Sequence, residues 1–352
     1  MSFNKITQDL NSEVAQRLSV KERVIPFGID FLDDTCYGIT PNDLFLVGAR
    51  SGSGKTQFCL NVARNALKHN KRVHFFALEA DNAEIERRLK FEIFQDLYQK
   101  KYPAKFADYQ KWSFGHYLPE DADLEAQTVE DFQKKYPADL FTFYKTGDFT
   151  VYTMVEEILK IAEDTDLIII DHVHYFDFDD DNENRAIKII AKTARDLVLE
   201  MGKPIILVSH IRKTNPKFDG FAPGMDDFHG SSDLYKIATR AITLGPGEYD
   251  PSGIAQTYIH VVKNRFDSSV TRFIGRVNYN FAKGSYDKGY EIGKCNQKRE
   301  REFETLEAKD CPRFVRQTVL RGCLLHADNN EKRVHANVRR KSFAQSLPYS
   351  DG

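Results

Sequence analysis

Apolar runs long enough for buried strands alternate with helical patterns through most of the chain. The runs occupy residues 44–47, 72–78, 140–144, 166–171 and 204–210. Segments with the spacing of an amphipathic helix lie between most of them. Strands that alternate with helices indicate a mostly parallel sheet that helices cover on both faces. We therefore predict an α/β fold for the body of the chain.

Three segments depart from this alternation. Residues 254–262 and 270–278 favour a late β-ribbon. Residues 98–137 are polar, rich in tyrosine and weakly periodic, which we interpret as a helical surface insertion. From residue 294 the pattern breaks down, so we expect residues 294–352 to form a tail that is partly helical and then disordered. The main domain is therefore expected to span residues 24–293.

A thin apolar stripe marks residues 1–23. Its apolar side chains recur at intervals of four, at Ile6, Leu10, Val14 and Leu18. Such a stripe suits a short helix but is too narrow for a separate domain. Two interpretations remain open: a helix packed on its own domain, or a linker arm that docks on a neighbouring subunit.

The charge of the chain is unevenly distributed. Of its 352 residues, 41% are hydrophobic and 29% are charged, which is ordinary for a globular protein. The net charge is −2, yet residues 294–352 carry 13 Lys and Arg against 8 Asp and Glu. The body is therefore mildly acidic. Bulk basicity gives no argument for nucleic acid binding, and any such contact has to come from local loops.

The cysteines and the lack of long apolar runs bear on the compartment. No run approaches the length of a membrane span, and the N-terminus lacks a signal-peptide pattern. The five scattered cysteines argue for reduced thiols inside a cell. We expect a cytoplasmic protein without a membrane partner. The host cytoplasm, for a phage or plasmid protein, and an organellar matrix remain open.

One glycine-rich stretch carries the clearest chemistry of the sequence. It follows the apolar run at 44–47, and a helical pattern comes directly after it. Its residues are Ala49, Arg50, Ser51, Gly52, Ser53, Gly54, Lys55 and Thr56, followed by Gln57. Strand, glycine-rich turn and a helix opened by Gly-Lys-Thr are the context of a phosphate-binding P-loop, although Ala49 stands where the first glycine is usual. We predict that this stretch binds a nucleoside triphosphate.

Each residue type in this stretch has a chemical reason. Gly52 and Gly54 let backbone N–H groups turn inward around phosphates, and the helix N-terminus adds further donors. Lys55 would reach the β- and γ-phosphates. The hydroxyl of Thr56 would bind Mg²⁺. We therefore expect ATP and Mg²⁺ as cofactors.

Two acidic residues end neighbouring apolar runs. Asp171 follows the run that starts at residue 166, and Glu79 follows the run at 72–78. The carboxyl ends of strands face the ligand crevice in an open α/β sheet, so Asp171 is a candidate for holding Mg²⁺. Glu79 is a candidate general base that activates the attacking water. Without the P-loop, each would be an ordinary acid at the end of a strand.

A series of short motifs occurs in a fixed order along the body. They occupy residues 27–33, 38–44, 49–56, 77–79, 170–172, 208–210 and 262–266. Over roughly residues 24–293 this series resembles the ATPase domain of DnaB-family replicative ring helicases, which has a RecA-like fold. That family also tolerates alanine at the first P-loop position. The resemblance does not extend to the tail.

The resemblance implies a motor that works between subunits. The expected assembly is a homo-oligomer, a hexameric ring that couples ATP hydrolysis to movement on single-stranded DNA in replication, with a primase or a loader as a candidate partner. Arg265 would reach into the neighbour's ATP as a charge-stabilising finger, with Lys263 beside it, and His210 would sense the γ-phosphate. From the residues alone, Lys263 and Arg265 could equally form an exposed basic pair. His210 could equally be a buried histidine bonded to the backbone.

The same resemblance assigns DNA contact to loops that face the channel of the ring. The loop after His210 carries Arg212, Lys213 and Lys217. Basic side chains that follow the phosphates of one strand would give salt-sensitive binding without sequence preference. The alternative is a solvated surface loop.

Two other functions remain open. A RecA- or RadA-like recombination ATPase would share the fold and would form filaments that exchange strands. A regulatory or loader-type ATP-binding protein without motor activity would show slow turnover that is indifferent to single-stranded DNA.

Overall fold

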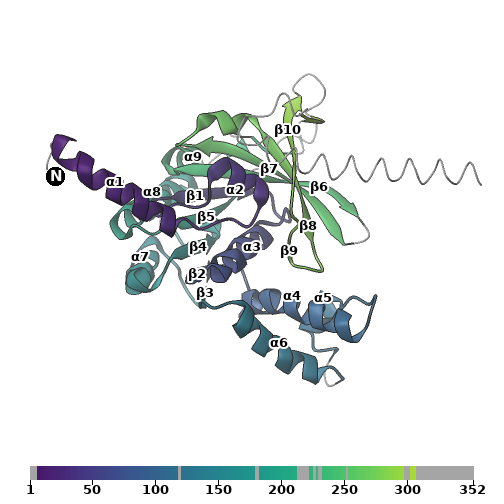
Figure 1. The fold of residues 1–352 in the computed structure, drawn as a ribbon. Coiled ribbons are helices and arrows are strands. Elements are labelled where there is room, and N and C mark those ends of the chain that lie inside the picture. Colours follow the sequence, from purple (N-terminus) through teal and green to yellow (C-terminus); the bar gives the residue numbers. More distant parts are fainter. Residues whose placement is uncertain are drawn as a thin grey trace, which may run out of the picture.

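A single large sheet forms the centre of the molecule (Figure 1). The computed structural model describes residues 6–117, 120–178, 182–211, 222–224, 227–228, 232–250, 253–296 and 302–306. The strands are β1 (Leu44–Ala49), β2 (Val73–Ala77), β3 (Leu140–Tyr144), β4 (Leu167–Asp171), β5 (Ile205–His210), β6 (Arg240–Asp250), β7 (Ile254–Asn264), β8 (Ile274–Asn280), β9 (Ser285–Tyr286), β10 (Glu291–Asn296) and β11 (Glu302–Thr305). Their order is β11-β10-β8-β7-β6-β1-β5-β4-β2-β3, with β9 paired to β8.

The sheet has a parallel part and an antiparallel part. Strands β3, β2, β4, β5, β1 and β6 pair in parallel. From β6 onward the pairs β6–β7, β7–β8, β8–β10 and β10–β11 are antiparallel. This arrangement confirms the predicted α/β fold with a mostly parallel central sheet and a late β-ribbon.

Helices cover both faces of the sheet. They are α1 (Ile6–Arg23), α2 (Asp30–Cys36), α3 (Lys55–Lys68), α4 (Glu84–Lys101), α5 (Tyr109–Ser113), α6 (Ala122–Lys135), α7 (Val151–Ile161), α8 (Glu183–Met201) and α9 (Ser232–Ile237). In β1, Phe45 and Val47 belong to the core that contains α2, α3 and α4, whereas Leu44 and Leu46 belong to the core with α7, α8 and α9. The two-residue period of a strand therefore divides one apolar run between two cores.

The late β-ribbon differs in detail from the sequence pattern. We expected a strand over residues 270–278, but Ser268–Arg272 forms a 3₁₀ helix and β8 begins only at Ile274. The Asp267 side chain accepts a hydrogen bond from the backbone N–H of Ser269 at 2.9 Å, and this local bond favours the turn over the strand.

The sheet also continues past residue 293, whereas we expected a tail there that is partly helical and then disordered. Strand β10 ends at Asn296, and β11 pairs with it. The ring of Phe303 in β11 packs against Tyr258, with centroids 5.3 Å apart, and against the guanidinium of Arg276. Packing on β7 and β8 therefore stabilises this short strand. The sequence pattern of β11 did not predict it, because contacts with distant segments produce no periodic pattern in the strand itself.

The segment interpreted as an insertion is helical over most of its described residues. Helices α4, α5 and α6 lie together (Figure 1), and α4 also contacts β3, because the hydroxyls of Thr142 and Tyr144 donate to the carboxylate of Glu86. Trp112 of α5 packs on Phe91 and Phe94 of α4. Helix α4 continues through residue 98, where we had placed the start of the insertion, so no break in the chain marks that boundary. The domain limits proposed from sequence therefore stay a prediction. Among the described residues, no helix is long and apolar enough to cross a membrane.

Candidate functional site

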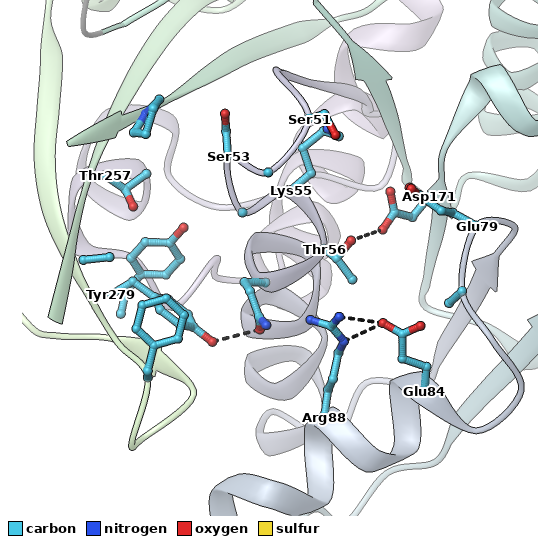
Figure 2. Close-up of a pocket in the computed structure, with 18 of the residues that line it drawn as sticks. Ser51, Ser53, Lys55, Thr56, Glu79, Glu84, Arg88, Asp171, Thr257 and Tyr279 are labelled. Carbon is cyan, nitrogen blue, oxygen red and sulfur yellow. Dashed lines mark hydrogen bonds and ion pairs between the residues drawn. The ribbon is translucent and has the colours of Figure 1, made fainter. Parts of the chain in front are cut away.

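The glycine-rich stretch connects β1 to α3 and lines a cavity of about 640 Å³ (Figure 2). Gly52 and Gly54 adopt φ values of 75° and 82°, a left-handed region that favours glycine. A Cβ built on either residue meets no atom within 4 Å, so open space lies in front of the backbone. The cavity wall includes Ser51, Gly52, Ser53, Gly54, Lys55, Thr56 and Gln57. The geometry fits a phosphate chain held by backbone N–H groups.

Lys55 is held by the loop and by the end of β5. Its Nζ donates to the carbonyl oxygens of Ala49, at 3.4 Å, and Arg50, at 3.0 Å. The same Nζ lies 3.0 Å from Nδ1 of His210. Strands β1 and β5 pair in parallel with Ala49 opposite His210, which explains why these two ends meet. Burial lowers the pKa of the Lys55 ammonium.

Asp171 and Thr56 form the second feature of the site. The Thr56 hydroxyl donates to Oδ2 of Asp171 at 2.8 Å (Figure 2). The other carboxylate oxygen, Oδ1, is buried without a hydrogen-bond partner among the described residues. Burial raises the pKa of Asp171 to about 6, against the lowering effect of the Thr56 hydrogen bond. A hydroxyl beside an unpartnered carboxylate oxygen suits Mg²⁺, a hard cation that takes oxygen ligands.

Glu79 lies beside this pair, two residues beyond the end of β2. Strands β2 and β4 pair with Ala77 opposite Asp171, so the chain after β2 passes the carboxylate of Asp171. The Glu79 side chain is 50% exposed, and its Oε2 lies 3.1 Å from Nε2 of His172. Glu79 also lines the cavity. A half-exposed carboxylate at the cavity wall can accept a proton from water that enters there.

His172 and His210, two histidines beside the site, are neutral at neutral pH. Burial lowers the pKa of His172 to about 2. Burial together with the charge of Lys55 lowers the pKa of His210 to about 4. His210 can therefore accept a hydrogen bond from the ammonium of Lys55 at Nδ1.

The opposite wall of the cavity comes from the late β-ribbon and was not predicted from sequence. Tyr249, Tyr279 and Phe281 line it, and the Tyr279 hydroxyl donates to Oε1 of Gln57 at 2.9 Å (Figure 2). These aromatic residues stand on β6 or at the end of β8, in no recognisable motif. Only the pairing of β6, β7 and β8 brings them opposite the P-loop.

Glu84 and Arg88 close the cavity on the side of α4. Nη2 of Arg88 lies 2.6 Å from Oε1 of Glu84, and both residues line the cavity (Figure 2). No motif pointed to this pair. The one available signal was its spacing of four residues on a predicted helix, which is common on any helix surface.

Gly48 marks a close contact just before the P-loop. A Cβ built at Gly48 would lie 2.4 Å from Cζ of the buried Phe228 and 3.0 Å from Cδ1 of Ile211. The glycine therefore gives room for the Phe228 ring against β1.

Lys263 and Arg265 do not line the cavity. The Nζ of Lys263 donates to the carbonyl oxygens of Tyr235 and Lys236, at 2.7 and 2.8 Å, which attaches β7 to α9. Arg265 is exposed, and its backbone N–H donates to the carbonyl oxygen of Thr239 at 3.1 Å. The structure therefore does not bring this pair together with Lys55, Thr56, Glu79, Asp171 and His210. Arg212, Lys213 and Lys217 lie outside the described residues.

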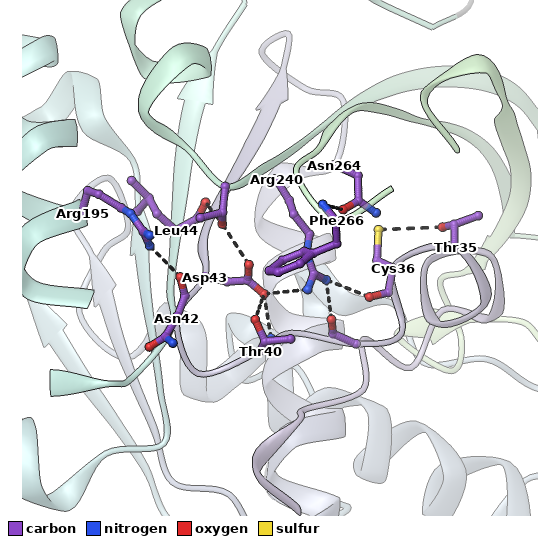
Figure 3. A network of polar contacts seen from close by, with 12 residues as sticks. Thr35, Cys36, Thr40, Asn42, Asp43, Leu44, Arg195, Arg240, Asn264 and Phe266 are labelled. Carbon is purple, nitrogen blue, oxygen red and sulfur yellow. Dashed lines mark hydrogen bonds and ion pairs between the residues drawn. The ribbon is translucent and has the colours of Figure 1, made fainter. Parts of the chain in front are cut away.

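A buried ion pair supports the segment that carries Arg265 (Figure 3). Nη2 of Arg240, at the start of β6, lies 3.1 Å from Oδ2 of Asp43, just before β1. The two side chains are 2% and 0% exposed. The Arg240 guanidinium also donates to the carbonyl oxygens of Cys36 and Gly38, and the Phe266 ring lies over it at 4.8 Å. The residue next to Arg265 thus packs on a fixed, buried charge.

The family model described as the DnaB-like helicase C terminal domain matches residues 24–283. The chain belongs to this family. Curated relatives of this DnaB-like chain include the replicative DNA helicase DnaB of Pasteurella multocida, 26% identical over 191 residues, or 53% of this chain and 38% of the relative. The DnaB of Geobacillus stearothermophilus is 41% identical over 66 residues, or 18% of this chain and 14% of the relative. The chain spans about half the length, or less, of the curated relatives it matches.

Solved structures share the fold of the DnaB-like chain. One that is described as an ATPase domain superposes with a TM-score of 0.62 at 18% identity, covering 87% of this chain and 100% of its own. A DnaB-like replicative helicase, described together with its interactions with primase, gives a TM-score of 0.63 at 18% identity over 81% of this chain and 67% of its own. These likenesses confirm the RecA-like fold of a helicase ATPase domain.

Proposed function

We propose that the chain is the ATPase motor of a DnaB-type replicative helicase, which couples Mg²⁺-dependent ATP hydrolysis to movement on single-stranded DNA. One observation carries the proposal: Lys55, Thr56, Glu79, Asp171 and His210 surround one cavity at the carboxyl ends of neighbouring strands. That edge is where open α/β sheets bind ligands. The family match over residues 24–283, which includes all five residues, supports the proposal.

The loop backbone and these five residues each have a role in this proposal. The backbone of residues 49–54 cradles the phosphates, and Lys55 leaves His210 to reach the β- and γ-phosphates. Thr56 and Asp171 would hold Mg²⁺, which would supply positive charge beside the phosphate oxygens. Glu79 accepts a proton from the attacking water. His210 then senses nucleotide, because it is bonded to Lys55 without nucleotide and released from Lys55 with nucleotide.

The aromatic wall is suited to a nucleobase. Tyr249 and Phe281 form an edge-to-face pair with centroids 6.0 Å apart and are 65% and 47% exposed. Exposed rings beside a phosphate cradle offer a stacking surface for a base. We infer that ATP binds with its phosphates at α3 and its base against the β-ribbon.

A ring would explain the residues that face away from the cavity. Arg265 is exposed and outside this chain's own cavity, so it is available to a neighbour's nucleotide as a charge-stabilising finger. Lys263 positions the same segment through its bonds to α9. Helix α1 projects from the body (Figure 1), with Leu10, Val14 and Leu18 exposed by 57%, 47% and 66%. We propose that α1 docks on a neighbouring subunit of a homo-oligomeric, hexameric ring.

The proposed DNA contact and protein partners are supported by the family match. We propose that Arg212, Lys213 and Lys217 contact single-stranded DNA in the channel of the ring. A primase or a loader is the proposed protein partner, because a DnaB-like helicase of the same fold was described with its interactions with primase.

The experiment that tests this function is ATP turnover with and without single-stranded DNA, at low and high salt. We expect ATP turnover that depends on Mg²⁺ and that single-stranded DNA stimulates at low salt. High salt should remove the stimulation, because it weakens contacts to DNA phosphates. Lys55→Ala should abolish turnover, whereas the matched control Lys160→Ala, an exposed lysine outside the cavity, should leave it unchanged. Turnover indifferent to DNA would contradict the motor and favour a regulatory ATPase.

A second assay separates the motor from a recombinase. A ring that excludes one strand should unwind a forked duplex and should appear as closed rings in electron micrographs. Filaments together with strand annealing, without unwinding, would contradict the helicase and favour a RecA-like recombination ATPase.

A further inference from the structure

The turn after β4 lies against the segment that carries Glu79. The backbone N–H of Leu78 donates to the carbonyl oxygen of Asp171 at 2.9 Å, so the chain that leaves β2 runs along the end of β4. In the 3₁₀ turn that follows β4, the backbone N–H of Tyr175 donates to the carbonyl oxygen of His172 at 3.1 Å. The rings of these two residues meet edge to face, with centroids 4.8 Å apart.

His172 presents a proton to the carboxylate of Glu79. The histidine is 1% exposed, and its Nδ1 accepts a hydrogen bond from the backbone N–H of His174 at 3.3 Å. A neutral imidazole has one donor nitrogen and one acceptor nitrogen, so the proton of this ring is on Nε2. That nitrogen lies 3.1 Å from Oε2 of Glu79.

The contact between these two side chains is close but not yet aligned. Nε2 of His172 has no hydrogen-bond partner of good geometry among the described residues. A buried N–H without an acceptor is unfavourable. The Glu79 side chain is 50% exposed, so a small rotation of its carboxylate can complete the bond.

Tyr175 is a second donor beside the same carboxylate. Its side chain is 37% exposed. Burial raises the pKa of its hydroxyl, and the charge of Glu79 and a hydrogen bond to that carboxylate raise it further. The hydroxyl therefore keeps its proton at neutral pH and can donate it to Glu79.

A general base has to stay within hydrogen-bond reach of the water that it activates. A half-exposed carboxylate without fixed partners can instead turn toward bulk solvent. Donors on Oε2 of Glu79 would hold the carboxylate in place and would leave its other oxygen, Oε1, to accept a proton from water.

We propose that His172 and Tyr175 are positioning residues that hold Glu79 in the orientation in which it accepts a proton from the attacking water. The proposal rests on the proposed function, because that function makes Glu79 the general base. Neither positioning residue lines the nucleotide cavity. Their loss should therefore lower kcat of ATP hydrolysis and leave KM for ATP nearly unchanged.

The first test measures kcat and KM for ATP in variants of the chain. His172→Leu should lower kcat at least about tenfold, because a base that is not held loses part of a contribution of about 10²–10⁴-fold. His172→Gln, whose amide nitrogen can replace Nε2, should keep kcat within about threefold of the unmodified chain. Tyr175→Phe keeps the ring and loses only the hydroxyl, so it should lower kcat at least about threefold. KM should change by less than about threefold in all three variants.

The matched controls are His116→Leu and Tyr152→Phe. Both residues are exposed and lie outside the cavity, so kcat should not change. Unchanged kcat in both His172→Leu and Tyr175→Phe would overturn the proposal.

The dependence on Glu79 separates positioning from a merely structural role. In Glu79→Ala no carboxylate remains to be held, so the addition of His172→Leu should lower the residual kcat by less than about twofold. A further tenfold loss would show that His172 acts through the structure in general and would overturn the proposal.

A measurement without nucleotide tests the contact apart from the proposed function. The urea midpoint of unfolding is compared for the unmodified chain, Glu79→Ala, His172→Leu and the double variant. We expect Glu79→Ala to lower the midpoint of the unmodified chain but not that of His172→Leu, in which the contact is already lost. Equal shifts in the two backgrounds would overturn the contact, whether or not the chain hydrolyses ATP. Full turnover in Glu79→Ala would instead contradict the general-base role of Glu79, and with it the positioning role, although the contact itself would stand.

Discussion

Nζ of Lys55 lies 3.0 Å from Nδ1 of His210, so the phosphate-binding loop is joined directly to the end of β5. The three N–H groups of the ammonium already have acceptors in the carbonyl oxygens of Ala49 and Arg50 and in Nδ1 of His210, so a nucleotide phosphate has to displace one of them. Nucleotide binding is therefore expected to release His210, and the segment that follows β5 would sense the change.

His210→Ala tests this coupling. We expect the substitution to remove most of the DNA stimulation of ATP turnover, because Lys55 loses its link to the end of β5. Nucleotide affinity should change by less than about tenfold, since the P-loop backbone stays intact. Turnover with a DNA titration and a fluorescent-nucleotide binding assay measure both effects. Full DNA stimulation in His210→Ala would disprove the coupling, and His69→Ala is the matched control.

Arg265→Ala tests the role of a finger between subunits. We expect turnover to fall by about 10³-fold while nucleotide binding is retained, because the arginine stabilises charge only in the transition state. The exposed Arg272→Ala should turn over normally. Mixing Arg265→Ala with Lys55→Ala subunits should restore part of the activity, because each supplies what the other lacks at a shared interface. No recovery on mixing would place Arg265 outside an intersubunit site.

Asp43→Asn tests the buried ion pair. We expect the free energy of unfolding to fall by about 3–5 kcal/mol, because Arg240 keeps a buried charge without its partner. Denaturant titration with circular dichroism measures the loss. The comparison is Arg72→Met, which breaks an exposed pair with Asp164 and should cost no more than about 1 kcal/mol. Similar losses in the two variants would contradict the structural role of Asp43.

Asp33 should make stability depend on pH. Its carboxylate accepts hydrogen bonds from the backbone N–H groups of Phe27 and Gly28, yet burial raises its pKa to about 6. Between about pH 4 and pH 6 the folded chain keeps a proton on Asp33 that the unfolded chain has released. The contribution of Asp33 to the free energy of unfolding should therefore fall as pH rises through this window, by up to about 3 kcal/mol.

Asp33→Asn removes this titration. The difference in unfolding free energy between the unmodified chain and Asp33→Asn should change steadily from pH 4 to pH 6, to the disadvantage of the unmodified chain, as measured by urea titration at each pH. A difference that is constant over this range would show that the two backbone hydrogen bonds outweigh burial.

The apolar stripe of α1 should contribute to assembly and not to folding. We expect the combined substitution of Leu10, Val14 and Leu18 by Ser to shift the chain from oligomers to monomers, because these side chains are exposed in the single chain. The midpoint of thermal unfolding of the monomer should not change. Analytical ultracentrifugation measures the assembly, and Arg17→Ala on the exposed helix is the control. Intact oligomers in the triple variant would contradict the docking of α1.

Local signals were enough to predict the parallel part of the sheet and the residues on its carboxyl edge. The P-loop, Asp171 and Glu79 each follow a short apolar run, and a parallel sheet brings such ends together whatever the details of pairing. The strand Arg240–Asp250 was missed, because it begins with a buried arginine and contains Gly245, Pro246 and Gly247.

The features that the sequence did not predict depend on contacts between segments that are far apart along the chain. Tyr249 and Phe281 reach the cavity only through the registers of β6, β7 and β8, and Arg240 meets Asp43 across nearly two hundred residues of chain. The contact between His172 and Glu79 was missed for the same reason.

The close contact between Gly48 and Phe228 constrains how sequences of this kind can vary. A side chain at position 48 would meet the Phe228 ring at 2.4 Å, and β1 cannot move away because strands pair with it on both sides. A larger residue at 48 therefore requires a smaller one at 228. These two positions, far apart along the chain, are expected to change together during evolution, and a survey of related sequences would show them as a co-varying pair.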